Sequence, residues 1–313
     1  MGGRPFASAL ADRPLLFEPV PPSARASGAR GAAHTEEIVR VLAATPRVDA
    51  VDVPELVDEN HEGRPYYRSG DTRGFAKTLA DRSGREAVVN KVVAHLASPT
   101  ALESWTRETM ARGIHHVVLV GGSSRYIPYP GPTVSEADRI SRPIVENAGG
   151  ILGNIAIPQR TGEAHRMLAK SRAGARFFTT QIVFDGDLFL KMVSEYDVLC
   201  RQAGIVPAAV ILSVAPIADE GDAEFVRWLG ADIPEVAERA ILNGDEASAG
   251  ARSIAWALSL WESVNRGWWE KELAVSIGIN VEQVTARHLG TAGEMLSALA
   301  RVLDVQGTAK PLA

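Results

Sequence analysis

Short runs rich in Val, Ile and Leu recur eight times along the whole 313-residue chain. Most of these runs are continuously apolar, which is typical of parallel strands buried on both faces. The predicted strands cover residues 15–20, 50–53, 87–96, 116–120, 151–157, 177–184, 208–214 and 273–279.

Segments with apolar residues at helical spacing separate the runs. The clearest predicted helices cover residues 34–45, 99–112, 187–202, 249–266 and 284–303. Thr35 and two following acids suit the positive end of the first helix, and Gly113 and Gly204 are expected stop signals for the next two. Residues 59–84 have a weak pattern, so we expect a long loop with one short helix there.

Eight alternations of strand and helix predict an α/β fold, a single (βα)8 TIM barrel. A doubly wound open sheet would need fewer strands, and no Gly-x-Gly-x-x-Gly follows the first strand. No linker divides the chain. We therefore expect one domain over residues 1–313, with residues 1–13 as a flexible N-terminal extension.

Composition and charge limit the classes of binding partner and the cellular location that we expect. The net charge is -5 and no long run of Lys or Arg occurs, so a small molecule is expected rather than a nucleic acid. The single cysteine, Cys200, excludes an intrachain disulfide and suits a reducing compartment. No apolar block has the length of a signal peptide or of a membrane-spanning helix, so we expect a cytoplasmic protein. Assembly into a homo-oligomer is left open.

Glu18 interrupts the first apolar run, in Leu-Leu-Phe-Glu-Pro-Val. Burial disfavours the charged carboxylate and raises its pKa, as a general acid near neutral pH requires. The alternative is a carboxylate paired with an arginine from a neighbouring strand.

Other polar residues end later strands. Gln181 offers an amide that suits the edge of a heterocycle such as a pterin, or it is a core residue satisfied by adjacent backbone. His95 ends the third strand, where a lone histidine is usually a hydrogen-bonded core residue. Gly121 and Gly122 follow the fourth strand and would let the backbone approach a phosphate or a ring, unless they form a plain turn.

No histidine or cysteine pair has the spacing of metal ligands, so no metal is expected. Four tryptophans at positions 256, 261, 268 and 269 cluster in one late helix and its exit. Trp261 and Trp268 share a helix face, which indicates packing on the barrel rather than a stacking platform.

Three motifs in order resemble the methylenetetrahydrofolate reductase family. They are Phe-Glu-x-x-Pro-Pro at residues 17–22, His-Leu at 95–96 and Ala-Gly-Ala-x-Phe-x-x-Thr-Gln-x-x-Phe-Asp at 173–185. Further matches in the same order lie at residues 113–117 and 209–212 and in the Trp-rich helix. The resemblance covers nearly the whole chain, at low identity outside the motifs.

The resemblance implies a (βα)8 barrel that reduces 5,10-methylenetetrahydrofolate to 5-methyltetrahydrofolate with electrons from NADH or NADPH, in a pathway toward methionine. In that family the glutamate matching Glu18 protonates the folate, so that its bridge opens to an iminium. The glutamine matching Gln181 contacts the pterin, and the eighth-strand asparagine, Asn280, is a further substrate-binding position. A hydride then reaches the methylene carbon, usually from bound FAD.

Departures from the family pattern lie on the cofactor side. Gly122 stands where the family usually has an aspartate near flavin and pterin, and Ile157 stands where it has a tyrosine. The segment before Lys170 is shorter, and Val281 replaces an arginine. Of the cofactor-binding positions, only His95 and Lys170 match.

Two interpretations of the cofactor follow. Either FAD is held by rebuilt loops, such as residues 126–129, or NAD(P)H delivers its hydride directly to the iminium, which we favour. A deazaflavin donor is a further alternative. An alternative from a different functional class is a folate-binding one-carbon carrier or methyl-transfer partner without reductase activity. The presence of Glu18 and Gln181 argues against it, because both could drift in a pure binding module.

Overall fold

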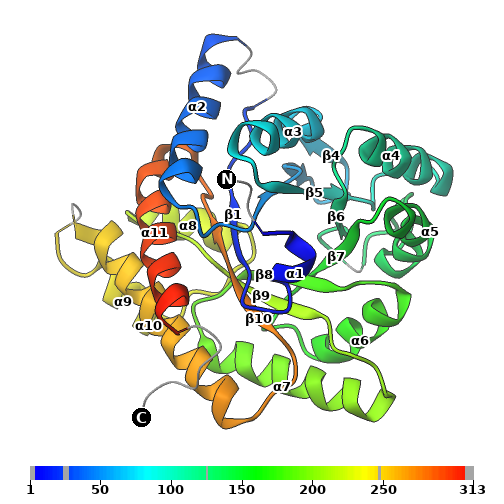
Figure 1. The fold of residues 1–313 in the computed structure, drawn as a ribbon. Coiled ribbons are helices and arrows are strands. Elements are labelled where there is room, and N and C mark those ends of the chain that lie inside the picture. The colour runs from blue at the N-terminus through cyan, green and yellow to red at the C-terminus, as the bar shows by residue number, and fades with distance from the viewer. Residues whose placement is uncertain (1–3, 24–27, 125, 246–247, 307–313) are drawn as a thin grey trace.

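The computed structural model describes residues 4–23, 28–124, 126–245 and 248–306. Eight parallel strands close into a barrel with helices around it (Figure 1), which confirms the predicted (βα)8 class. The barrel order is β1-β10-β9-β8-β7-β6-β5-β2. These strands are β1 (Leu15–Glu18), β2 (Ala50–Val53), β5 (Glu86–Val92), β6 (His116–Val120), β7 (Ile151–Ala156), β8 (Phe177–Ile182), β9 (Ala209–Val214) and β10 (Ile277–Glu282).

Helices follow the strands along the outside of the barrel. They are α2 (Ala29–Ala44), α3 (Thr72–Ser83), α4 (Pro99–Ala111), α5 (Val134–Asn147), α6 (Glu163–Ala173), α7 (Gly186–Ala203), α8 (Glu220–Trp228), α9 (Glu235–Leu242), α10 (Ala249–Glu270) and α11 (Leu289–Gln306). All five helices predicted by periodicity begin or end within a few residues of the expected positions.

Two local expectations are wrong. The first large helix, α2, begins at Ala29 after Gly28, so the Thr35 hydroxyl is no cap; it donates instead to the Gly31 carbonyl inside the helix. Residues 59–84 hold more order than a loop, because a hairpin of β3 (Val57–Glu59) and β4 (Pro65–Tyr67) precedes the whole of α3.

The last barrel strand is also displaced from its prediction. It begins at Ile277 and continues to Glu282, whereas the apolar run suggested residues 273–279. The apolar run shows which residues are buried, but the hydrogen-bonded ladder with β1 and β9 determines which residues form the strand. The difference places Asn280 and Glu282 inside the sheet.

Side chains alternate between the two faces of each strand. One face packs on the helices, and the other fills the barrel with an apolar cluster that includes Leu16, Ala50, Val118 and Ile211. Gly153 lies opposite Phe177, whose ring fills the interior so closely that a Cβ on Gly153 would meet it at 2.4 Å. A glycine is therefore needed at that point.

The N-terminal segment closes the barrel at the amino ends of its strands. Phe6, on the one-turn helix α1 (Phe6–Ala9), is fully buried and meets the Phe177 ring edge-on at 5.2 Å. Its ring also lies 5.1 Å from that of His116. Phe6 thus forms the base of the interior cluster.

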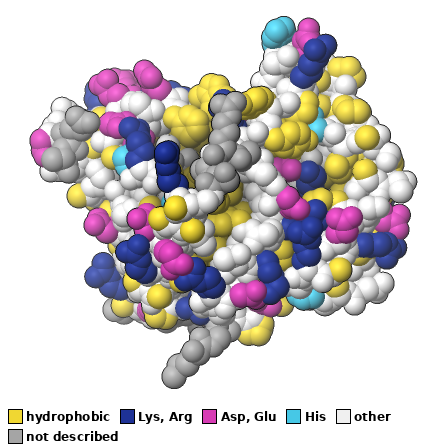
Figure 2. Space-filling view, turned by 90° about the horizontal axis from the view of Figure 1, so that it is seen from above, with side chains coloured by type: hydrophobic (Ala, Val, Ile, Leu, Met, Phe, Trp, Pro, Cys, Tyr) yellow, Lys and Arg dark blue, Asp and Glu magenta, His cyan; other side chains and the backbone are white. Residues whose placement is uncertain are grey.

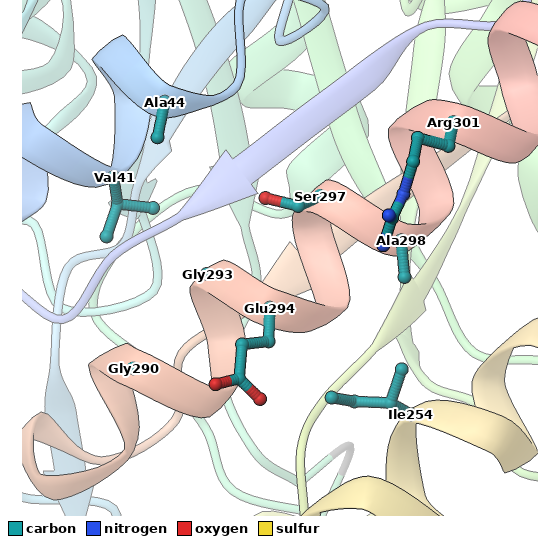
Figure 3. Close-up of a pocket in the computed structure, with 9 residues that line it drawn as sticks. All are labelled: Val41, Ala44, Ile254, Gly290, Gly293, Glu294, Ser297, Ala298 and Arg301. Carbon is teal, nitrogen blue, oxygen red and sulfur yellow. The ribbon is translucent and has the colours of Figure 1, made fainter.

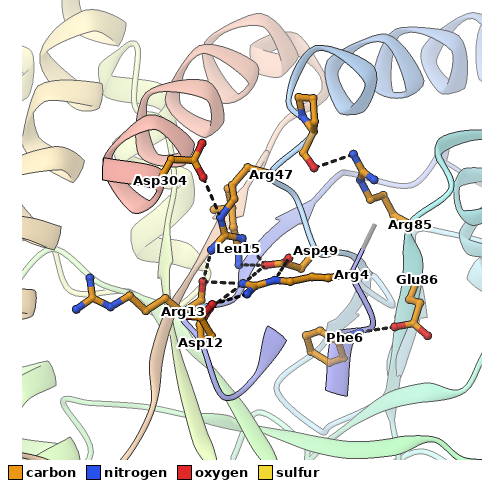
Figure 4. Close-up of polar contacts among 11 residues, drawn as sticks. Arg4, Phe6, Asp12, Arg13, Leu15, Arg47, Asp49, Arg85, Glu86 and Asp304 are labelled. Atoms are coloured by element: carbon orange, nitrogen blue, oxygen red, sulfur yellow. Dashed lines mark hydrogen bonds and ion pairs between the residues drawn. The ribbon is translucent and has the colours of Figure 1, made fainter. Parts of the chain in front are cut away.

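Charged residues hold this segment in place (Figure 4). The Arg4 guanidinium donates to Asp49 at 2.6 Å and to Asp12 at 2.7 Å. Asp49 is nearly buried and also accepts from the Leu15 backbone and from Arg47. The expectation of a flexible extension is therefore wrong for residues 4–13; residues 1–3 lie outside the described residues.

Packing explains other residues noted in the sequence. Trp261 is fully buried in the layer between strands and helices, as expected, and Cys200 is buried there too. On the face shown in Figure 2, apolar side chains gather around a central hollow among acidic and basic ones. Among the described residues, no helix has both the length and the apolar character to cross a membrane.

We predict that Phe6→Ala lowers the free energy of unfolding by roughly 3–5 kcal/mol, because it empties the base of the barrel. Urea unfolding followed by tryptophan fluorescence measures the change. Val236→Ala is the control, since Val236 is 60% exposed and such a surface change typically costs less than about 0.5 kcal/mol. A loss no larger than that of the control would show that α1 does not stabilise the barrel.

Candidate active site

Polar side chains line the barrel interior toward the carboxyl ends of the strands, where the sites of such barrels lie. Each of these polar residues lies on the inward face of its strand, nearer to the carboxyl end than the residues of the apolar cluster. These residues are Glu18, Asp52, Asn90, Thr179, Ser213 and Asn280. The interior thus changes from apolar at the base to polar at the mouth.

Glu18 ends β1 and its carboxyl is half-buried in this polar layer. Burial raises its pKa to about 7, although a hydrogen bond from Asn280 acts in the opposite direction. Within the described part of the chain no arginine pairs with it, so the alternative interpretation of Glu18 is not what the structure shows there. A carboxyl with such a pKa can hold and release a proton near neutral pH.

Asn280 fixes how Glu18 presents its proton. Its Nδ2 donates to Glu18 Oε2 at 2.8 Å and to the Ser213 hydroxyl at 3.2 Å. Both N–H bonds of the amide are thereby used. Because Oε2 accepts from Asn280, the proton of neutral Glu18 resides on Oε1. The structure brings these two predicted residues together.

Two further carboxyls in this layer were missed by the sequence reasoning. Glu282 is the direct ladder partner of Glu18, and Asp52 follows the paired residues of β2 on the other side. Burial and the neighbouring Glu18 charge raise the pKa of each well above its ordinary value. Asp52 interrupts the apolar run at 50–53 and could have been noticed there; Glu282 lay beyond the predicted strand.

Gln181 lies near the end of β8, and its amide contacts backbone. Nε2 donates to the Leu229 carbonyl at 2.8 Å, and Oε1 accepts from the Ile182 N–H at 3.0 Å. This is the backbone-satisfied state that the sequence left as an alternative. A ligand at Gln181 would have to replace the Leu229 contact.

The Leu229 contact brings the end of α8 to the mouth. Phe225 and Trp228 are stacked there with ring centroids 5.6 Å apart, and Trp228 is 60% exposed. Sequence reasoning did not single out this aromatic pair, although two aromatic residues three positions apart share a helix face.

The expected cofactor positions His95, Gly121 and Gly122 lie together, but the chain itself contacts them. His95 shares a hydrogen bond of 2.8 Å with Glu59, which also accepts from the hydroxyls of Ser123 and Tyr129, each at 2.6 Å. Burial raises the pKa of Glu59, but these hydrogen bonds outweigh it and the net shift is downward.

The Tyr129 ring covers Gly122. A Cβ on Gly122 would lie 2.2 Å from the nearest ring atom, and the same ring meets His95 edge-on at 5.5 Å. The space that the missing side chain leaves is therefore filled by Tyr129, not open to a planar ligand in this conformation.

Lys170 and Ile157 lie at α6 and after β7, which pairs with β6 and is opposite β1 in the barrel order. The Lys170 ammonium donates to the Ile155 carbonyl at 2.7 Å and lies 3.9 Å from Glu163. Burial lowers its pKa, and only part of this shift is offset by Glu163 and Asp138. The Ile157 N–H donates to Glu163 as well. The structure does not bring these residues to Glu18.

Two other features lie outside the polar barrel layer. A groove of about 490 Å³ lies outside the barrel between α2, α10 and α11 (Figure 3), lined mainly by small residues with Glu294 and Arg301. It contains none of the polar barrel layer. Among the described residues, Asp219, Asp222 and His288 lie close enough to share a cation. Arg287 already pairs with both aspartates, at 3.3 and 2.8 Å.

Comparison with known proteins supports the motif resemblance. The family model described as methylenetetrahydrofolate reductase matches residues 157–263, which include Gln181 and the Phe225–Trp228 pair. No protein of curated function matches the chain.

A solved structure shares the fold. It is titled as an uncharacterized protein from Clostridium thermocellum that binds two copies of 5-methyl-5,6,7,8-tetrahydrofolic acid. The alignment has a TM-score of 0.76 and 16% sequence identity, and it covers 95% of this chain and 99% of the other. The motifs and the family match together show that residues 157–263 of this chain are similar to the methylenetetrahydrofolate reductase family.

Proposed function

We propose that the protein binds a reduced folate at the barrel mouth and reduces 5,10-methylenetetrahydrofolate to 5-methyltetrahydrofolate with NAD(P)H. The observation that carries the proposal is Glu18, a half-buried carboxyl with a pKa raised to about 7 and oriented by Asn280. The family match and the folate bound by the structural relative from Clostridium thermocellum support the substrate class.

Glu18 acts as the general acid. Its Oε1 proton passes to a nitrogen of the folate bridge, the adjacent C–N bond breaks, and the methylene carbon becomes an electrophilic iminium. Hydride from NAD(P)H then forms the methyl group. Asn280 stabilises the carboxylate that remains, because its N–H already points at Oε2.

The aromatic pair Phe225 and Trp228 suits an aryl group of the same ligand. The pair lies on α8, the helix that Leu229 follows, and the Leu229 carbonyl accepts from Gln181. Aromatic side chains stack favourably on aromatic ligand rings. In this arrangement Gln181 would exchange the Leu229 carbonyl for the pterin edge. The pterin and the aryl group would then lie side by side at the mouth.

The residues present do not fit FAD at the family's usual position. Tyr129 covers Gly122, and Glu59 joins His95, Ser123 and Tyr129 in one hydrogen-bonded cluster. Lys170 is turned to the Ile155 carbonyl. The proposed hydride donor is therefore NAD(P)H itself. Its nicotinamide ring would not stack on Gly122, because Tyr129 covers that glycine.

We predict that Glu18→Gln lowers turnover of 5,10-methylenetetrahydrofolate with NAD(P)H by about 10²–10⁴-fold, because it removes the proton donor and keeps the shape. Folate affinity should stay within about tenfold. In the parent, kcat/KM should fall as the pH rises through the Glu18 pKa of about 7, since the free enzyme must carry the proton.

Glu294→Gln, on the exposed face of α11, is the matched control. A Glu18→Gln protein that keeps more than about half the parent rate would remove Glu18 from the mechanism. Folate binding without turnover in the parent would instead favour the carrier function.

We predict that Gln181→Ala weakens folate binding by roughly 1–3 kcal/mol, because a buried pterin edge loses its partner. Calorimetric titration of both proteins with 5-methyltetrahydrofolate measures the difference, with Gln202→Ala at the exposed end of α7 as the control. Equal affinities would leave Gln181 a structural residue that holds Leu229.

We predict that the purified protein carries no stoichiometric flavin and reduces its substrate with NAD(P)H alone. The visible spectrum reports bound flavin, and protein refolded without flavin is assayed with and without added FAD. Activity that depends strictly on FAD would contradict the prediction and would require Tyr129 to leave Gly122.

A further inference from the structure

The last helix, α11, presents one stripe of residues that stay exposed or partly exposed. The members recur every three or four positions and therefore share a helix face. They are Gly290, Glu294, Ser297, Ala298, Arg301 and Val305. The opposite face of α11 packs in the large core cluster through Met295, Leu296 and Leu299. The helix is thus fixed to the barrel by one side and open on the other.

Most of the stripe forms the floor of the groove between α2 and α10 (Figure 3). Val41 and Ala44 of α2 form one wall, and Ile254 of α10 forms the other. The floor residues are mainly small, and a Cβ built on Gly290 meets no atom within 4 Å. The groove therefore has room for side chains of another molecule.

Two charged residues on the floor form no ion pair with any described residue. Glu294 and Arg301 are both exposed, and they lie seven positions apart, beyond the three or four positions at which side chains on a helix pair. The nearest acid to Arg301 on α11 is Asp304, which pairs with Arg47 at 3.4 Å instead. A partner that offers an acid to Arg301 and a base to Glu294 would complement both charges.

A second copy of the same helix offers both charges in the required places. The midpoint between Glu294 and Arg301 falls between Ser297 and Ala298. When two α11 helices run antiparallel about a twofold axis at that midpoint, Glu294 lies opposite Arg301 of the partner subunit. The twofold axis forms this contact twice. Small side chains at the axis let the two helices approach closely.

The ends of the stripe are complementary about the same midpoint. Val305 is apolar and 88% exposed, and the axis relates its position to that of Gly290, where a side chain finds open space. Contact between them would remove apolar surface of Val305 from water, which favours association. Charge, side-chain size and apolar surface thus fit one axis. A groove for an unrelated helix would not need this symmetry in its own residues.

We propose that the chain forms a twofold dimer through this face, with the two α11 helices antiparallel and Glu294 paired with Arg301 of the partner subunit. The groove contains none of the polar residues of the barrel mouth, so each subunit keeps its own complete mouth. The inference does not depend on the proposed reductase activity. Turnover and folate affinity per chain should be the same in dimers and in dissociated variants.

Analytical ultracentrifugation of the parent and of charge variants tests the pairing. Arg301→Glu and Glu294→Arg each place like charges opposite one another twice, so each should raise the dimer dissociation constant about 10–100-fold. A double variant with both substitutions restores opposite charges and should dimerise as the parent does. Lys191→Glu, exposed on α7, is the control for a charge change elsewhere. A monomeric parent, or a double variant no better than the single ones, would overturn the inference.

Disulfide cross-linking locates the axis and needs no enzymatic activity. A cysteine that replaces Ser297 lies beside the axis and faces its own copy, so oxidised Ser297→Cys should form a covalent dimer. Val206→Cys is the matched control, because Val206 is 88% exposed after α7 and the native Cys200 is buried. Equal cross-linking of the two variants would refute the α11 axis. A cross-linked dimer without turnover would refute the proposed function and support the dimer.

Discussion

Burial of Glu18 inside the parallel ladder is the constraint on which the candidate site depends. A carboxyl at the end of β1 must share the barrel interior with Glu282 and Asp52, because the register with β10 and β2 is fixed by the strands. The cost of an unpaired buried charge then favours the protonated form. Acidic character near neutral pH is a consequence of the sheet rather than of any single side chain.

The two ends of the barrel differ in polarity: the base is apolar and the mouth is polar. At the base, Phe6 and Phe177 fill the interior with apolar surface, and the Arg4–Asp49 pair holds the closing segment against the strands. At the mouth, the same strands present Glu18, Asn280 and their polar neighbours. A packed base keeps the strand register in place, and the register determines which side chains meet at the mouth.

The chain's own side chains fill the space around Gly122 at the mouth. Tyr129 lies on Gly122, and Glu59 from the β3–β4 hairpin gathers the hydrogen bonds of His95, Ser123 and Tyr129. These contacts join two loops that are far apart in the sequence. A side chain at Gly122 would collide with the Tyr129 ring, so this arrangement requires a glycine there.

The sequence by itself determined the barrel, because eight buried parallel strands require eight apolar runs and helices between them. It also marked Glu18, since a carboxyl within such a run is visible without coordinates. Only the tertiary structure decided what surrounds it. Asn280 and Glu282 reach Glu18 from 262 and 264 positions away, through a ladder whose register no local pattern encodes. The packing of Phe6 depends on the same long-range closure, because its partners Phe177 and His116 are far away in the sequence. Local sequence therefore predicted only a flexible extension for residues 4–13.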